Sequence, residues 1–386
     1  MIQVAQSAPP VQPVQPVHRV GLDLHSNNVV AVMINESERW VLKRKFTLNL
    51  PDILSALEPY KETILEIGVE ATYNWYSVVD GFQEAGYKIR LAHPAKIEGN
   101  RSKKRTDDYD DAFHLAHLLR VNNFPDAYIY PKEDRPLRDL LRKRAFLVRS
   151  RTQYMVSFIN LVNRNLGIAI GGNKVKKLSE EDVEELLEQE YLILSGQANI
   201  SVMHHVEKEI HKLERVILRA GRLKAEFRKL LTIPGIGTII ALTIAYEAGD
   251  FSRFKKVGNY VSYCRCVDSK SLTNGKKKGE NNRKSGNKYL CWAYVEAANF
   301  TKRYCPYAYV YYRHKLKESG LTVLALKALA SKIARASYHV LTTDEPYNPE
   351  KVFERYKNEA QALISQKQKK GCGSKPGNGT GSKPGV

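Results

Sequence analysis

The chain has 386 residues, 43% of them hydrophobic, so it is long enough for two or more domains that each bury a core. Its 61 lysines and arginines against 41 acidic residues give a net charge of +20, which argues against an ordinary metabolic enzyme and favours a polyanionic partner. Its cysteines show neither a disulfide framework nor zinc-ligand spacing, and no apolar run approaches the roughly 18 residues of a membrane span, so we expect a cytoplasmic protein without membrane contact.

The first folded region has the pattern of an α/β domain. Residues 1–17 are rich in Pro, Val and Gln and predict a disordered arm. Apolar alternation and β-branched runs predict strands, and helical spacing of apolar residues predicts helices. The expected strands lie at 20–34 (a hairpin), 40–48, 63–70 and 87–92, and the expected helices at 54–60, 75–86 and 107–120. This order predicts an α/β domain over residues 18–130.

From about Pro131 the pattern changes to long helices. Residues 135–166 form one helical pattern, a polar insert follows at 171–177, and Ser179 is placed to cap an acidic helix. Apolar residues from Val206 to Phe227 recur with the spacing of a coiled-coil seam. This spacing fits a helical hairpin within the chain and a zipper between two copies equally well. We predict a helical coiled-coil linker over residues 131–228.

The following region, residues 229–345, is predicted to be mostly helical. A P-G-I-G turn at 234–237 joins two helices, which suits either phosphate binding by backbone N–H groups or packing alone. Residues 260–266 have a strand-like pattern, and a basic loop follows. Helices are expected at 289–300 and 323–341, and packing is the favoured role of the aromatic stretch 304–312. Residues 346–386 predict a helix end and a disordered basic tail from about Gln366.

Four carboxylates stand at positions typical of a metal site. Asp23 interrupts an apolar strand, where an uncompensated charge is costly, and Glu70 ends a buried strand, where α/β sheets place their sites. Asp108 and Asp111 share one face at the start of a helix. Taken singly, each is more readily explained as a helix cap or a turn residue. Together, in a basic protein, they favour a catalytic site that binds Mg²⁺ or Mn²⁺ and holds a phosphate.

The segments GLDLH, VEATYNWY and RTDDYDDAFHLAHLLR, in this order, resemble the DEDD-type RuvC-like domain of transposases of the insertion sequence one-hundred-and-ten family, which includes the Piv-type invertases. LLTIPGIG, SLTNGKKKG and SGNKYL are similar to the C-terminal transposase domain of that family. The resemblance spans roughly residues 20–341. It implies an RNase H-like (RuvC-like) fold, excision and insertion of a mobile element by DNA strand exchange, and a metal-binding tetrad. The implied tetrad is Asp23, Glu70, Asp108 and Asp111, or Asp107 or Asp110 if the register differs by one.

The resemblance also implies a hydroxyl nucleophile. In the family, a Ser shortly before a Gly attacks the phosphodiester and holds the DNA covalently, while the carboxylate site lies in trans. The matching residues here run from Ser271 to Gly275 and place Thr273 at that position, with Ser271 as the near alternative. The β-methyl group of Thr restricts its side chain and crowds in-line attack. We therefore expect a slow Thr273 nucleophile, a substitute role for Ser271, or an impaired copy.

The implied partners are double-stranded target and donor DNA and a structured non-coding guide RNA that pairs with both. A homodimer or homotetramer is expected, because strand exchange requires four cleavages. Basic residues after the loop and on the segments 96–105 and 135–151 are candidates for phosphate contacts, although they also suit a merely solvated surface. The candidates are Lys103, Lys104, Arg105, Arg142, Lys143, Arg144, Lys276, Lys277, Lys278, Arg283, Lys284 and Lys288.

Two other functions fit parts of the same pattern. A structure-selective nuclease that hydrolyses DNA junctions would need the carboxylates alone and would form no covalent protein–DNA adduct. A basic architectural or RNA-binding protein would use its acidic residues only as helix caps, so that Asp23→Asn and Asp108→Asn would change no activity. The order and number of the motifs favour the recombinase over both.

Overall fold

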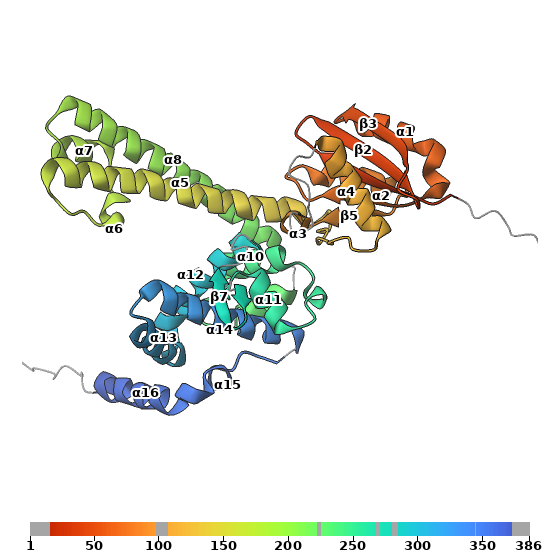
Figure 1. The fold of residues 1–386 in the computed structure, drawn as a ribbon. Helices are drawn as coiled ribbons and strands as arrows, with labels where there is room; N and C mark the ends of the chain where they lie inside the picture. Colours follow the sequence, from red (N-terminus) through yellow and green to blue (C-terminus); the bar gives the residue numbers. More distant parts are fainter. Residues whose placement is uncertain are drawn as a thin grey trace, which may run out of the picture. The chain divides into compact units, whose positions relative to one another are not determined.

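The computed structural model describes residues 16–97, 107–221, 225–267, 271–279, 285–343 and 345–372. The chain divides into two compact units, Met1–Lys132 and Glu133–Val386 (Figure 1), and each is described by itself. Nearly all of the expected N-terminal arm lies outside the described residues. So do Lys103, Lys104, Arg105, Arg283 and Lys284, together with residues 373–386 of the expected tail.

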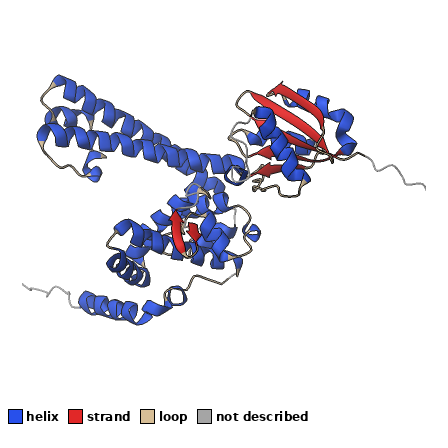
Figure 2. Ribbon diagram, in the orientation of Figure 1, coloured by secondary structure: helices blue, strands red, loops and turns tan. Residues whose placement is uncertain are grey.

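A mixed five-stranded sheet forms the first unit, with the strand order β3-β2-β1-β4-β5 (Figure 2). β1, β2 and β3 are antiparallel neighbours, whereas β4 runs parallel to β1 and β5 runs parallel to β4. The strands are β1 (His18–Leu24), β2 (Asn28–Asn35), β3 (Trp40–Thr47), β4 (Ile64–Glu70) and β5 (Ile89–Ala92). The predicted hairpin and strands are confirmed, and the sheet is compatible with the expected RNase H-like domain.

Helices cover both faces of this sheet. β2 is buried on both sides because its alternate residues face different helices: Met33 packs in the core with α1 and α2, and Val32 packs against α4. α1 starts earlier than predicted, since Pro51 is accommodated in its first turn, where a backbone N–H has no helical partner. The helices are α1 (Leu50–Leu57), α2 (Trp75–Glu84), α3 (Pro94–Ile97) and α4 (Asp108–Arg120).

A long helical hairpin opens the second unit. α5 (Arg135–Leu166) and α8 (Glu190–Gly221) lie side by side (Figure 1), and the short helices α6 (Gly172–Val175) and α7 (Glu180–Leu186) connect them. The predicted cap is confirmed, because the Ser179 side chain accepts a hydrogen bond from the backbone N–H of Asp182. The polar insert contains α6, which was not predicted.

The apolar seam of α8 packs within its own chain. Ile210 and Ile217 are buried, and Arg144 on α5 forms an ion pair with Glu214 on α8 at 2.7 Å. The structure therefore contains the helical hairpin, the first of the two expected arrangements. A coiled coil between copies remains a prediction.

The rest of the second unit is a helical core that also carries a small β-hairpin. Two sequence predictions are wrong here. Residues 260–266 are not a strand but the end of α11 and a turn, because Tyr260, Val261 and Cys264 all face the core. A disordered tail was predicted from about Gln366, whereas α16 continues to Cys372. The elements are α9 (Ala225–Leu230), α10 (Thr238–Ala248), α11 (Val257–Tyr263), β6 (Ser271–Thr273), β7 (Lys276–Gly279), α12 (Lys288–Tyr304), α13 (Pro306–Ser319), α14 (Thr322–Thr342), α15 (Pro349–Val352) and α16 (Lys357–Cys372).

Two further expectations for this unit are confirmed. The P-G-I-G turn joins α9 to α10, and a Cβ atom on Gly235 would lie 2.4 Å from the backbone nitrogen of Thr301, so the turn packs closely on α12. In the aromatic stretch, packing is confirmed for Tyr307, Tyr311 and Tyr312, which are buried in the core, whereas Tyr304 and Tyr309 are exposed. Among the described residues of the chain, no helix has both the length and the apolar character needed to cross a membrane.

Candidate active site

Two strand glycines let α4 lie close to the sheet. A Cβ atom on Gly21 of β1 would lie 1.8 Å from the carbonyl oxygen of Ala112, and one on Gly68 of β4 would lie 3.1 Å from the Leu119 side chain, both on α4. Because strand residues alternate between faces, Asp23 and Glu70 point to the same face as these glycines. The close approach brings the first turn of α4 to the ends of β1 and β4.

Asp23 and Asp108 meet at this edge of the sheet, with His25 between them. The Nε2 atom of His25 lies 3.1 Å from Oδ2 of Asp23 and 3.5 Å from Oδ1 of Asp108. Lys45 of β3 approaches from the other side, with its Nζ atom 3.2 Å from Oδ2 of Asp108. Asp23 is nearly buried, at 8% exposure, whereas the Asp108 side chain is about half exposed. The site is therefore open to solvent on the side of α4.

The donor set suits a divalent metal ion. One ligand atom from each of Asp23, His25 and Asp108 lies within 4.8 Å of the others. An ion bound at 2.0–2.6 Å from oxygen ligands can bridge atoms at about this separation. Carboxylate oxygens suit Mg²⁺, and an imidazole nitrogen adds a donor that suits Mn²⁺ and other transition metals better.

The remaining two carboxylates of the predicted tetrad lie beside this group. Glu70 ends β4 one residue beyond the pairing of Leu22 with Val69, so it is the neighbour of Asp23 in the sheet. Asp111 is four residues before Leu115, one of the α4 residues buried against the sheet, and so lies on the sheet-facing side of the helix. Neither belongs to the group of atoms within 4.8 Å. The structure thus brings Asp23 and Asp108 together and puts Glu70 and Asp111 at the same edge.

Asp107, one of the alternatives in the acidic run, has a different role. Its carboxylate accepts a hydrogen bond of 2.8 Å from the backbone N–H of Asp110 and caps α4. A negative charge at the N-terminus of α4 also interacts favourably with the helix dipole. Helix capping therefore accounts for Asp107, whereas Asp108 faces Asp23 and His25.

The predicted nucleophile lies on the β6–β7 hairpin of the second unit. Asn274 and Gly275 form its turn with φ angles of 51° and 74°, the left-handed backbone that a two-residue type I′ turn requires. Thr273 pairs with Lys276 on either side of this turn, and both residues are exposed. For Ser271, Lys277 and Lys278 the described structure covers only the backbone. The expected basic loop is thus a tight hairpin with Thr273 next to its tip.

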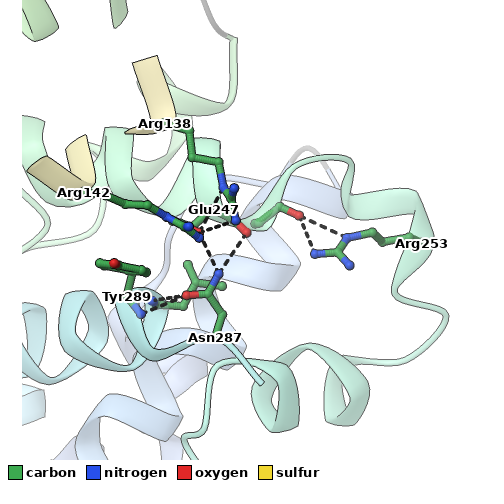
Figure 3. Close-up of polar contacts among 8 residues, drawn as sticks. Arg138, Arg142, Glu247, Arg253, Asn287 and Tyr289 are labelled. Atoms are coloured by element: carbon green, nitrogen blue, oxygen red, sulfur yellow. Dashed lines mark hydrogen bonds and ion pairs between the residues drawn. The ribbon is translucent and has the colours of Figure 1, made fainter. Parts of the chain in front are cut away.

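A buried polar cluster lies where the chain returns from this hairpin (Figure 3). Glu247 of α10 is fully buried and accepts hydrogen bonds from Arg138 (3.2 Å), Arg142 (2.5 Å) and the side-chain amide of Asn287 (2.7 Å). Burial by itself would raise the pKa of Glu247. The Arg142 hydrogen bond, the charges of both arginines and the Asn287 amide outweigh it and hold this pKa below its ordinary value.

Several basic residues nominated from the sequence have partners within the protein. Arg142 binds Glu247 and lies 4.5 Å from the centre of the Tyr289 ring, and Arg144 binds Glu214. Lys143, Lys276 and Lys288 are exposed. The exposed lysines thus remain the better candidates for phosphate contacts.

Sequence reasoning missed His25, Lys45, Glu247 and Asn287. His25 had a usable signal, because it stands two residues after Asp23 in GLDLH and so projects on the same side of an extended chain. Glu247 was also detectable as a lone acidic residue in the apolar helix LTIAYEA. Asn287 stands within SGNKYL, directly before a predicted helix, where Asn is a typical cap, whereas Lys45 carries no local signal.

Comparison with known families identifies both halves of the chain. A model of DEDD transposases of the IS110 type matches residues 20–165, and a model described as Transposase IS116/IS110/IS902 family matches residues 227–313. Together these segments cover more than half of the 386 residues. The chain belongs to the IS110-type transposases, which implies DNA transposition, and its DEDD domain suggests the use of a divalent metal ion.

Curated relatives agree with this assignment. The chain is 24% identical over 347 residues to a protein of Pseudomonas aeruginosa named "Probable family 20 transposase", covering 86% of this chain and 98% of the relative. It is 22% identical over 331 residues to "Transposase for insertion sequence element IS1328" of Yersinia enterocolitica, covering 84% of this chain and 96% of the relative. Both similarities extend over most of each chain.

Proposed function

We propose that this transposase excises and inserts its element by DNA strand exchange, using a divalent-metal carboxylate site and a hydroxyl nucleophile. The observation that carries the proposal is the meeting of Asp23, His25 and Asp108 at one edge of the sheet in a DEDD transposase domain. An isolated helix cap would not require α4 to pack so closely on Gly21 that Asp108 reaches Asp23.

The carboxylate site would hold Mg²⁺ or Mn²⁺ through Asp23 and Asp108, with Glu70 and Asp111 as further ligands. A bound ion would polarise the phosphate and stabilise the charge that develops on its oxygens. Asp23 is held on a strand and Asp108 on the helix packed against it, so the protein keeps both carboxylates in place. Lys45 balances part of the negative charge of Asp108.

The covalent step would use the hydroxyl of Thr273, with Ser271 as the alternative. Its oxygen forms a bond to the DNA phosphorus as the bond from phosphorus to a deoxyribose oxygen breaks, and the hydroxyl proton ends on that leaving oxygen. The DNA is then held as a phosphodiester to the protein. Thr273 suits this role because it is exposed and its backbone is fixed next to a tight turn.

The partners we propose are target and donor DNA, a structured guide RNA and further copies of the chain. A net charge of +20 supports binding of polyanions, and the exposed Lys143, Lys276 and Lys288 are available to contact phosphates. In such a complex the protein would contact the sugar–phosphate backbone of the nucleic acid, and base pairing between guide RNA and DNA would select the DNA sequence. A homodimer or homotetramer would supply the four cleavages of strand exchange.

Expressing the gene with its native flanking DNA, and sequencing the nucleic acid that co-purifies with the protein, tests the proposal. One defined transcript from the flank is the expected result. A heterogeneous mixture would contradict guide-RNA recognition and leave DNA recombination to be tested separately.

Adduct formation on a plasmid that carries the same gene and flanks tests the chemistry. The parent protein should form a covalent adduct, whereas Asp23→Asn and the double variant Ser271→Ala, Thr273→Ala should not. Cleavage that survives loss of both hydroxyls, without an adduct, would favour the junction nuclease. Activity that survives Asp23→Asn and Asp108→Asn would contradict the carboxylate site.

A further inference from the structure

Glu247 is a carboxylate that the proposed chemistry does not use, in a place where a charge is expensive. It lies in α10, whose buried residues are otherwise almost all apolar, and its side chain is fully buried. A charge in such surroundings persists only when it is paired and hydrogen-bonded. Arg138 and Arg142, from the first two turns of α5, supply the pairing at 3.1 Å and 2.5 Å.

Asn287 supplies the third donor and connects this ion cluster to α12. Its side-chain N–H donates to Oε2 of Glu247 at 2.7 Å, and its side-chain oxygen accepts from the backbone N–H groups of Tyr289 and Leu290 at 2.8 and 3.1 Å. One buried side chain therefore caps α12 and binds Glu247 at the same time (Figure 3).

The same residue also fixes the chain that follows the β6–β7 hairpin to the end of α11. The backbone N–H of Asn287 donates to the carbonyl of Tyr263 at 2.6 Å, and the Arg265 side chain donates to the carbonyl of Gly286 at 3.0 Å. Gly286 has a φ of 91°, and a Cβ atom there would lie 2.5 Å from the Tyr263 oxygen. The chain thus returns from the hairpin through a point fixed to the end of α11, with no room for a side chain at residue 286.

We propose that Glu247 and Asn287 are positioning residues for the nucleophile hairpin. Glu247 holds Asn287, and Asn287 holds the return point of the segment that carries Thr273. The two arginines join this return point to α5, so a buried ion cluster holds the point through which the hairpin segment rejoins the helical core. This inference rests on the proposed covalent function of the hairpin.

A purely structural role would also explain a buried ion cluster, so the test needs a matched control. The pair of Arg144 and Glu214 provides one, because it joins the same helix α5 to α8 at 2.7 Å and neither residue contacts the hairpin return point. Asn287→Ser keeps a good capping residue for α12 but is too short to reach Glu247. Asn287→Asp keeps the shape and the cap but places a second carboxylate against Glu247.

Hydrogen exchange of the hairpin amides gives the first readout. In Asn287→Ser and Asn287→Asp, exchange of residues 271–279 should be at least about ten-fold faster, while exchange along α5 and α8 is unchanged. Glu214→Gln should speed exchange along α5 and α8 and leave exchange of residues 271–279 unchanged. Equal exchange of the hairpin in the parent and both Asn287 variants would overturn the proposal.

Adduct formation on the plasmid with the chain's own gene and flanks gives the second readout. At saturating DNA, both Asn287 variants should form the adduct about a hundred-fold more slowly, the effect expected of a displacement of about 1 Å, with DNA affinity unchanged. Glu214→Gln should react like the parent. A similar loss of rate in Glu214→Gln would overturn positioning in favour of general destabilisation. If the adduct survives loss of both Ser271 and Thr273, the proposed covalent function is wrong. The hydrogen-exchange measurement then still tests whether Asn287 holds the hairpin in place.

Discussion

The imidazole of His25 lies between the carboxylates of Asp23 and Asp108, 3.1 Å from one and 3.5 Å from the other. Asp23 and Asp108 come from a strand and a helix that are 85 positions apart in the chain, and the packing of α4 on Gly21 brings them together. The candidate metal ligands therefore include a histidine in addition to the Asp and Glu residues of the DEDD motif.

His25→Ala should weaken Mn²⁺ binding roughly ten-fold or more and leave Mg²⁺ binding nearly unchanged. An imidazole nitrogen binds Mn²⁺ well, whereas Mg²⁺ depends on the carboxylate oxygens. Titration calorimetry with each ion measures both affinities. His117→Ala is the matched control, because His117 lies on the same helix as Asp108 but binds Glu38 at 2.6 Å. Unaltered Mn²⁺ affinity in His25→Ala would exclude His25 as a ligand.

Gly21→Ala should displace α4, because the added Cβ atom would lie 1.8 Å from the carbonyl oxygen of Ala112. We expect a loss of about 1–3 kcal/mol in the free energy of unfolding, together with loss of metal binding. Denaturant unfolding and calorimetry measure the two effects. Gly171→Ala is the control, since nothing lies within 4 Å of its Cβ position and its φ is −79°; its stability should change by less than about 0.5 kcal/mol. Unchanged metal binding in Gly21→Ala would contradict the role of close packing.

Acid should weaken the second unit through Glu247. Its pKa is lower in the folded protein than in the unfolded chain, so its contribution to stability is present above about pH 4.3 and is lost as pH falls through the folded pKa. Glu247→Gln should therefore be less stable by about 3–5 kcal/mol at neutral pH, and its stability should depend less on pH below that point.

Urea unfolding between neutral and acidic pH checks this difference between the parent and Glu247→Gln. Glu345→Gln serves as the comparison, because the pKa of Glu345 is also lowered by Lys351 but both side chains are largely exposed. Its pH profile should follow that of the parent. Parallel profiles for the parent and Glu247→Gln would show that Glu247 is not the group that titrates.

Thr273→Ala should abolish the covalent adduct, and Thr273→Ser should form it faster than the parent because the crowding β-methyl group is gone. Single-turnover adduct formation on gels measures both rates. If Thr273→Ala still forms the adduct and Ser271→Ala does not, Ser271 is the nucleophile.

Lys276→Ala should reduce the salt dependence of DNA binding. Each phosphate contact contributes about 0.9 to the slope of the logarithm of affinity against the logarithm of salt concentration. Binding isotherms at several salt concentrations give this slope. Lys132→Ala is the control, because its Nζ atom is bound to Glu84 at 2.8 Å. An unaltered slope in Lys276→Ala would place this lysine outside the phosphate contacts.

Local patterns were sufficient for most elements of this protein. The strand β4 and the long helix α5 were predicted almost to their ends, because a continuous apolar run and a helical period are both visible in consecutive residues. The Asn274-Gly275 turn also carried a strong hairpin signal that the prediction of a basic loop overlooked. By contrast, α11 was mistaken for a strand, since the core that buries Tyr260 is formed by distant helices.

The sequence by itself determined the order of the main elements of the first unit, the candidate carboxylates and the family of the chain, because each depends on short motifs. Only the tertiary structure decided that His25 joins Asp23 and Asp108, that Asp107 is a cap, and that Arg142 binds a buried glutamate. Those outcomes depend on contacts between residues far apart in the chain. Their energies are set by burial and by the atoms that packing brings within reach, which no local pattern records.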